Sequence, residues 1–182
     1  MSVHDDALAD LYQAAKQGKW ALLSQLFDEL PRLAAKAARY VKPSSGWSFL
    51  HQAAYFGHEG AAGLLIGAGA KPARRSNAGE TPSDVAAERG HDALATMLRR
   101  AMSTGEASWA PVDDPAVLPS SCAWAEGRRC RAETELKVGY AGAVITIPPG
   151  AVHYRDSFGR ILVGWHGSYG PPCGMDGGPM VD

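Results

Sequence analysis

The chain has 182 residues, of which 46% are hydrophobic and 20% are charged. This length accommodates one domain or two small ones, and the composition is ordinary for a folded protein. The 18 basic and 19 acidic residues give a formal net charge of −1. This balance lacks the strongly basic character of a general nucleic-acid-binding protein, so we expect no nucleic-acid partner.

The start of the chain favours a cytoplasmic location. Asp5 and Asp6 stand where a signal peptide would carry positive charge. No stretch approaches the roughly 18 consecutive apolar residues that cross a bilayer. The three cysteines, Cys122, Cys130 and Cys173, all lie in the last third of the chain and are expected to be free thiols in a reducing compartment. We therefore expect a soluble protein without a membrane partner.

Two segments of the first hundred residues repeat each other without a gap. Residues 46–58 (GWSFLHQAAYFGH) and residues 79–91 (GETPSDVAAERGH) align at a spacing of 33 residues. In each segment a hydroxyl residue can cap a first helix, paired alanines allow close helix packing, and a glycine marks a turn before a second helix. The glycines at residues 67–69 suit the end of the second helix of the earlier unit. The sequence therefore predicts two consecutive helix–turn–helix units.

A third, earlier copy appears if an insertion is allowed. Residues 11–15 (LYQAA) and Gly18 match residues 50–54 (LHQAA) and Gly57 at a spacing of 39 residues. We expect the extra residues in a lengthened helical connector over residues 28–40, where a proline opens an alanine-rich run.

Together these segments, over residues 8–101, resemble ankyrin repeats. The resemblance is closest at LHQAA and Gly57-His58 in the central unit, and at Thr81-Pro82 and Gly90-His91 in the last unit. It implies a short stack of about three units, each a tight turn followed by two antiparallel helices. The motif histidines are then expected to bond to neighbouring turns rather than to a metal: His51, His58 and His91.

The family resemblance also implies a mode of action. Ankyrin repeats bind other proteins on a concave face formed by the turn tips and the inner helices, so we expect a protein-interaction module or adaptor whose partner is another protein. Tyr55 and Phe56 stand out, because binding hot spots are rich in aromatic residues and arginine. Transferred by position, the candidate binding residues are Trp47, Phe49, Tyr55, Phe56, Arg75, Asn77, Glu80 and Arg89.

The character of the sequence changes after Met102. Residues 103–121 contain three prolines and no helical period, which predicts a linker or a packed extended segment. Strand-like patterns follow at residues 135–140, 143–147 and 160–166. We therefore expect an α+β protein, in which an ankyrin-repeat α-solenoid over residues 1–102 precedes a small antiparallel β-rich domain with an irregular tail over residues 122–182.

The last region also contains the residue types of a catalytic centre. A thiol nucleophile with imidazole bases and an orienting carboxylate could be formed by Cys173, His153, His166 and Asp156. An enzyme whose repeats recruit the substrate is thus the alternative to a binding protein. The simpler interpretation has both histidines facing solvent, and Trp165 either in the core or in a second binding site. No close cysteine pair with zinc-ligand spacing is present, so we expect no metal and no cofactor. The partner and the oligomeric state are left open.

Overall fold

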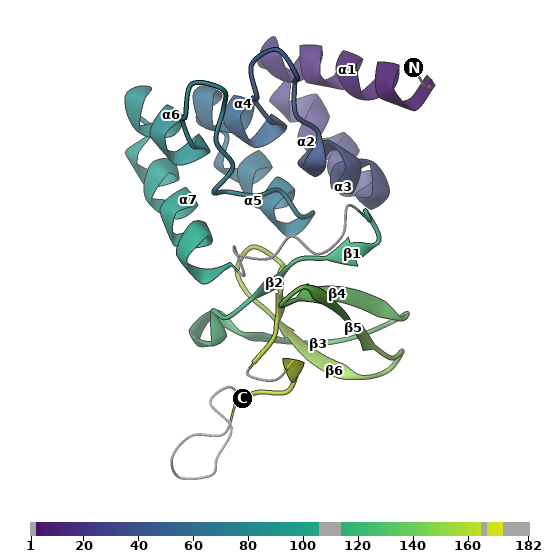
Figure 1. The fold of residues 1–182 in the computed structure, drawn as a ribbon. Helices are drawn as coiled ribbons and strands as arrows, with labels where there is room; N and C mark the ends of the chain where they lie inside the picture. Colours follow the sequence, from purple (N-terminus) through teal and green to yellow (C-terminus); the bar gives the residue numbers. More distant parts are fainter. Residues whose placement is uncertain (1–2, 106–113, 165–166, 173–182) are drawn as a thin grey trace. The chain divides into compact units, whose positions relative to one another are not determined.

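The computed structural model describes residues 3–105, 114–164 and 167–172. The chain forms two compact units, Met1–Met102 and Ser103–Asp182. The first unit consists of helices and the second of short strands, which confirms the α+β class (Figure 1). We describe each unit by itself.

In the helical unit, the first helices of the repeats lie side by side. They are α1, α4 and α6, while α2 and α5 pack together in a second layer (Figure 1). None of the helices in the described part of the chain is long and apolar enough to cross a membrane. The helices are α1 (Val3–Lys16), α2 (Trp20–Glu29), α3 (Pro31–Arg39), α4 (Phe49–Phe56), α5 (Glu59–Gly67), α6 (Pro82–Glu88) and α7 (Asp92–Thr104).

The 33-residue repeat of the sequence is also a repeat of the backbone. Ser48 and Thr81 cap α4 and α6, and each side-chain oxygen accepts a bond from the backbone N–H of the third helical residue. The side chains of those residues, His51 and Asp84, accept in return from the backbone N–H of the cap and complete a capping box. The predicted helix–turn–helix units, the earlier copy included, are confirmed by the turn glycines, which share a positive φ: Gly18 (76°), Gly57 (73°) and Gly90 (76°).

The predicted connector forms the helix α3 between the first and second copies. Its last residue, Arg39, donates from its guanidinium to the carbonyl oxygen of Ala68 at 3.1 Å, just past the end of α5. The same guanidinium lies close to Gly69: a Cβ added at Gly69 would be only 3.0 Å from it. The inserted helix therefore supplies a donor to the carbonyls that α5 leaves unpaired at its end.

Aromatic rings fill the centre of the helical unit. Phe49 is completely buried, and its ring meets Tyr12 edge-on at 5.3 Å and Tyr40 at 5.7 Å between centroids. Such edge-to-face pairs contribute about 0.5–1.5 kcal/mol each beyond the area that they bury. The fully buried side chains around them include Trp20, Leu23, Leu50, Leu65, Ile66, Leu94 and Leu98.

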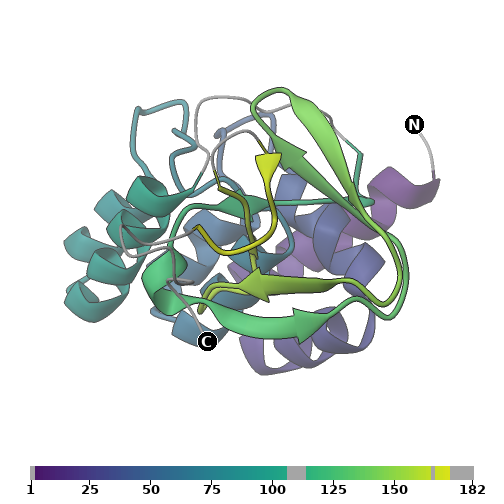
Figure 2. The same cartoon turned by 90° about the horizontal axis from the view of Figure 1, so that it is seen from below.

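The second unit contains two small sheets, ordered β1-β4-β5 and β2-β7-β6-β3 (Figures 1 and 2). The strands expected at residues 135–140 and 143–147 are confirmed as β4 and β5. Within residues 160–164 of the third expected run the strand is β7, and residues 165–166 lie outside the described residues. The strands are β1 (Val117–Leu118), β2 (Ser120–Ser121), β3 (Arg128–Arg131), β4 (Leu136–Tyr140), β5 (Ala143–Ile147), β6 (Val152–Arg155) and β7 (Ile161–Leu162), with a 3₁₀ turn at Trp124–Glu126.

The sheets are mixed rather than purely antiparallel. β1 runs parallel to β4, and β2 runs parallel to β7, while the hairpin pairs are antiparallel. Both parallel strands come from residues 117–121, the end of the segment expected to be a linker or a packed extension. Their two-residue length carries too little pattern to be recognised as strand in a sequence. This part of the segment belongs to the sheets, and residues 106–113 lie outside the described residues.

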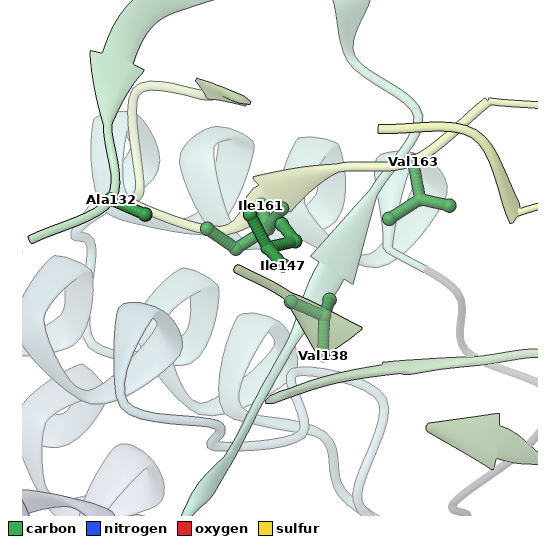
Figure 3. Packing of buried hydrophobic residues seen from close by; sticks show 5 residues of the cluster. All are labelled: Ala132, Val138, Ile147, Ile161 and Val163. Carbon is green, nitrogen blue, oxygen red and sulfur yellow. The ribbon is translucent and has the colours of Figure 1, made fainter. Parts of the chain in front are cut away.

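The β unit rests on a small apolar core and one buried ion pair. One buried cluster of this core consists of Ala132, Val138, Ile147, Ile161 and Val163 (Figure 3). The Arg160 guanidinium donates to the Asp156 carboxylate at 2.8 Å, with both side chains at most 3% exposed.

Candidate functional site

Three of the expected binding residues meet on the surface of the helical unit. Trp47 precedes the cap of α4, Tyr55 lies in the last turn of that helix, and Arg89 follows α6. The Trp47 and Tyr55 ring centroids are 6.1 Å apart, and the Arg89 guanidinium carbon lies 4.2 Å from the centroid of the Tyr55 ring. Both rings are half-buried and Arg89 is exposed. We call these three residues the aromatic–arginine strip.

Helix geometry and the repeat together produce this strip. Trp47 stacks on His51 at 5.7 Å, and Tyr55 follows His51 by one helical turn on the same face of α4. Arg89 occupies the position equivalent to Phe56 one repeat later, so it comes from the neighbouring unit. An exposed cation–π contact of this kind contributes about 0.5–1 kcal/mol and holds the arginine in place.

His51 supports the strip from below. Its Nδ1 accepts the backbone N–H of Ser48 at 3.2 Å, and its Nε2 lies 3.1 Å from the carbonyl oxygen of Glu80. A carbonyl only accepts, so Nε2 carries the proton and the ring is neutral. Burial lowers the pKa of His51 and favours that neutral form. The expected bond from this histidine to the neighbouring turn is confirmed.

The other expected residues of the turn tips are engaged within the turns. Arg75 donates to the Gly79 carbonyl at 2.7 Å, and the Asn77 side chain lies 3.4 Å from the Ser44 carbonyl of the preceding turn. A Glu80 carboxylate oxygen accepts the hydroxyl of Ser76 at 3.1 Å. These three side chains hold the turns together.

The two other expected aromatic residues are turned toward the interior, although the Phe56 ring meets the Tyr55 ring edge-on at 5.2 Å. Phe49 lies in the core at 0% exposure, so its assignment to the binding face is corrected: the first helical residue after the cap points inward. Phe56 is half-buried and packs over Gly18 of the first copy, where an added Cβ would come within 3.1 Å of its ring. Phe56 therefore packs the second copy of the repeat against the first copy, within the helical unit.

Of the alternative catalytic centre, the structure describes His153 and Asp156, and each is engaged by other residues. Trp165, His166 and Cys173 lie outside the described residues. His153 is 1% exposed rather than solvent-facing, and its Nε2 accepts from the Arg155 guanidinium at 3.2 Å. Burial and the adjacent Arg155 lower the pKa of His153.

The candidate carboxylate, Asp156, has a structural role. It accepts from the backbone N–H groups of Phe158 and Arg160 at 2.9 Å and from the Arg160 side chain. These bonds shape the turn between β6 and β7 and occupy both carboxylate oxygens. No group of three His, Cys, Asp or Glu side chains with the geometry of a metal site occurs among the described residues.

Sequence reasoning identified the members of the strip and missed their pairing. Tyr55 and Arg89 are 34 residues apart in a 33-residue repeat, and this offset was the signal that places them on adjacent units. It also missed the arginines of β3, because a run of three arginines within four residues reads as an ordinary solvated strand.

Comparison with known proteins finds a distant, partial likeness. A stretch of 63 residues is 44% identical to the calmodulin-binding transcription activator CBT of Oryza sativa subsp. japonica. The match covers 31% of this chain, which spans only 7% of the length of that protein. The chain matches no protein-family model.

Proposed function

We propose that the helical unit is a minimal ankyrin-type stack that binds a segment of another protein across the aromatic–arginine strip. The observation that carries the proposal is the joining of Trp47, Tyr55 and Arg89 from two successive repeats into one surface. The duplicated capping boxes and the partial likeness to the rice protein support the ankyrin-type interpretation.

The strip has the chemistry of an interface hot spot. Tryptophan, tyrosine and arginine dominate binding energies because they combine a large apolar area with directional donors. Here the rings are held by stacking on His51 and by Arg89, so little side-chain freedom is lost when a partner binds. An apolar side chain of the partner would lie against Trp47, and a carbonyl or carboxylate would accept from Arg89.

Quantitative affinity capture from the native cell tests this proposal. Trp47→Ala and Arg89→Ala are compared with the wild type and with Leu22→Ala, which changes a side chain 62% exposed on α2. The same partners should be lost from both strip variants and kept by the α2 control, with unchanged melting temperatures showing that each variant is folded. Equal capture by all four proteins would contradict the proposal.

A further inference from the structure

The strand β3 forms one edge of its sheet and carries a row of arginines. In the described part of the β unit, β3 pairs only with β6 and lies outside it (Figure 2). The side chains of Arg128, Arg129 and Arg131 are exposed, and Cys130 between them is half-buried. An exposed edge of this kind is a template for pairing with another extended chain.

The phase of the β3–β6 ladder shows which backbone groups are available. Just past β3, the N–H of Ala132 donates to the carbonyl of Ala151 at 2.9 Å. In an antiparallel ladder, pairs that exchange hydrogen bonds alternate with pairs that do not. The bonded pairs are therefore those of Cys130 with His153 and Arg128 with Arg155.

It follows that Arg129 and Arg131 turn their backbone N–H and C=O groups away from β6. Within the residues that the structure describes, these four groups have no hydrogen-bond partner. The donors and acceptors that an added strand would use are therefore the backbone groups of Arg129 and Arg131, the residues before and after Cys130.

The charge of the edge selects what can pair with it. Arg128 lies directly opposite Arg155, and like charges in that position are destabilising unless an anion offsets them. Among the described residues, no carboxylate lies within ion-pair distance of the β3 arginines. The nearby Glu126 accepts instead from the backbone N–H of Ser157 at 3.3 Å. The arginines keep most of their guanidinium donors, although Arg131 gives one to the Gly150 carbonyl at 2.9 Å.

We propose that β3 binds an extended acidic segment of a partner protein by strand addition. The segment pairs through its backbone with Arg129 and Arg131, and its acidic side chains at alternate positions face those two guanidinium groups. Backbone pairing supplies affinity and the alternate side chains supply selectivity, as in other cases of strand addition.

Two other occupants fit the edge less well. A second copy of this chain, pairing β3 with β3, would place arginines against arginines across the new ladder. A nucleic acid would satisfy the arginines but has no peptide N–H and C=O groups for Arg129 and Arg131. The proposal concerns the β unit alone and does not depend on the aromatic–arginine strip.

Peptide binding to the full chain tests the proposal directly. The probe is a short fluorescent peptide in which glutamate alternates with threonine, and its affinity is measured by anisotropy. Arg129→Glu/Arg131→Glu should weaken binding at least tenfold, since each exposed charge pair is worth about 1 kcal/mol or about fivefold in affinity. The matched control Lys137→Glu, on β4 in the other sheet, should leave the affinity nearly unchanged.

Charge reversal and backbone methylation separate strand addition from simple attraction. The doubly reversed variant should bind a lysine–threonine peptide in place of the glutamate peptide. Methylating alternate backbone nitrogens of the glutamate peptide keeps its charge and removes its donors, and it should abolish binding. Equal affinity of the methylated peptide, or of an oligouridylate, would overturn the proposal, as would the absence of binding by the unmodified peptide.

Amide hydrogen exchange gives a second readout at the edge itself. Saturating peptide should slow exchange at the backbone N–H groups of Arg129 and Arg131, which are the donors to the added strand. Exchange that is unchanged at these two positions while the peptide is bound would also overturn the proposal.

Discussion

The two units of this protein reach a stable structure by different means. The helical unit repeats one local solution, a capped helix, a glycine turn and a second helix, around a continuous aromatic core. The described residues of the β unit include a buried apolar cluster around Val138, Ile147 and Ile161 and a buried ion pair that shapes one turn. The helical unit thus repeats one local motif, whereas the contacts described in the β unit each occur once.

Removing one charge should have the largest effect on the β unit. Arg160→Met leaves the buried Asp156 carboxylate without its partner, which typically costs about 3–5 kcal/mol. The double variant Asp156→Asn/Arg160→Met should recover part of this loss. Urea denaturation monitored by amide exchange at β6 and β7 measures both. A single variant as stable as the wild type would show that the ion pair is dispensable.

Removing one ring should have a comparable effect on the helical unit. Phe49→Ala creates a cavity among Tyr12, Tyr40 and Phe27 and should cost about 3–5 kcal/mol. Amide exchange should accelerate through α1 to α6 while β4 and β5 keep their protection. Equal acceleration in both units would contradict the division into two compact units.

Replacing two glycines of the helical unit by alanine should change its stability in opposite directions. Gly57 has a φ of 73°, and an added Cβ would lie 2.6 Å from the His91 ring, so Gly57→Ala should destabilise the unit by more than about 1 kcal/mol. Gly63 lies inside α5 with open space around it, so Gly63→Ala should stabilise by about 0.5–1 kcal/mol. The urea midpoints of the two alanine variants, compared with that of the wild type, measure these changes in stability. A Gly57→Ala variant as stable as the wild type would show that the positive φ of this turn is not essential.

The smallest expected effect is a dependence of the helical unit on pH. Burial places the pKa of folded His51 below its value of about 6.5 in an unfolded chain. As the pH falls through the unfolded pKa, the unfolded state therefore binds more protons than the folded state. The contribution of neutral His51 to stability is complete above the unfolded pKa and decreases below it. His51→Gln should flatten the decrease in the urea midpoint between neutral and mildly acidic pH. If the urea midpoint of the variant decreases with pH as steeply as that of the wild type, His51 is not the source of the pH dependence.

The same comparison explains what the sequence could predict. The helical unit was readable because its interactions are local and duplicated: Ser48 and Thr81 each cap a helix, and each lies two residues after a glycine of the repeat. Even the inserted helix was signalled by Pro31 and its alanines. Contacts between residues far apart in the sequence could not be predicted, such as the contact of Arg39 with the end of α5, 29 residues away.

In the β unit the decisive pairings are not local. The parallel partners of residues 117–121 lie about twenty to forty residues further along the chain, and two-residue strands have no periodicity to reveal them. His153 also illustrates the limit. It was expected to face solvent because it alternates with apolar neighbours, yet both faces of β6 are covered, and it is buried like Tyr154.

Site-specific photo-crosslinking in the native cell tests the central proposal, binding through the aromatic–arginine strip, most directly. A photoreactive amino acid replaces the exposed Glu88, which precedes Arg89 at the end of α6, in one protein and Leu22 on α2 in another. We predict a discrete cross-linked partner from position 88 that is lost when Trp47→Ala is added, and none of that partner from position 22. The same partner captured from position 22 and not from position 88 would contradict the account.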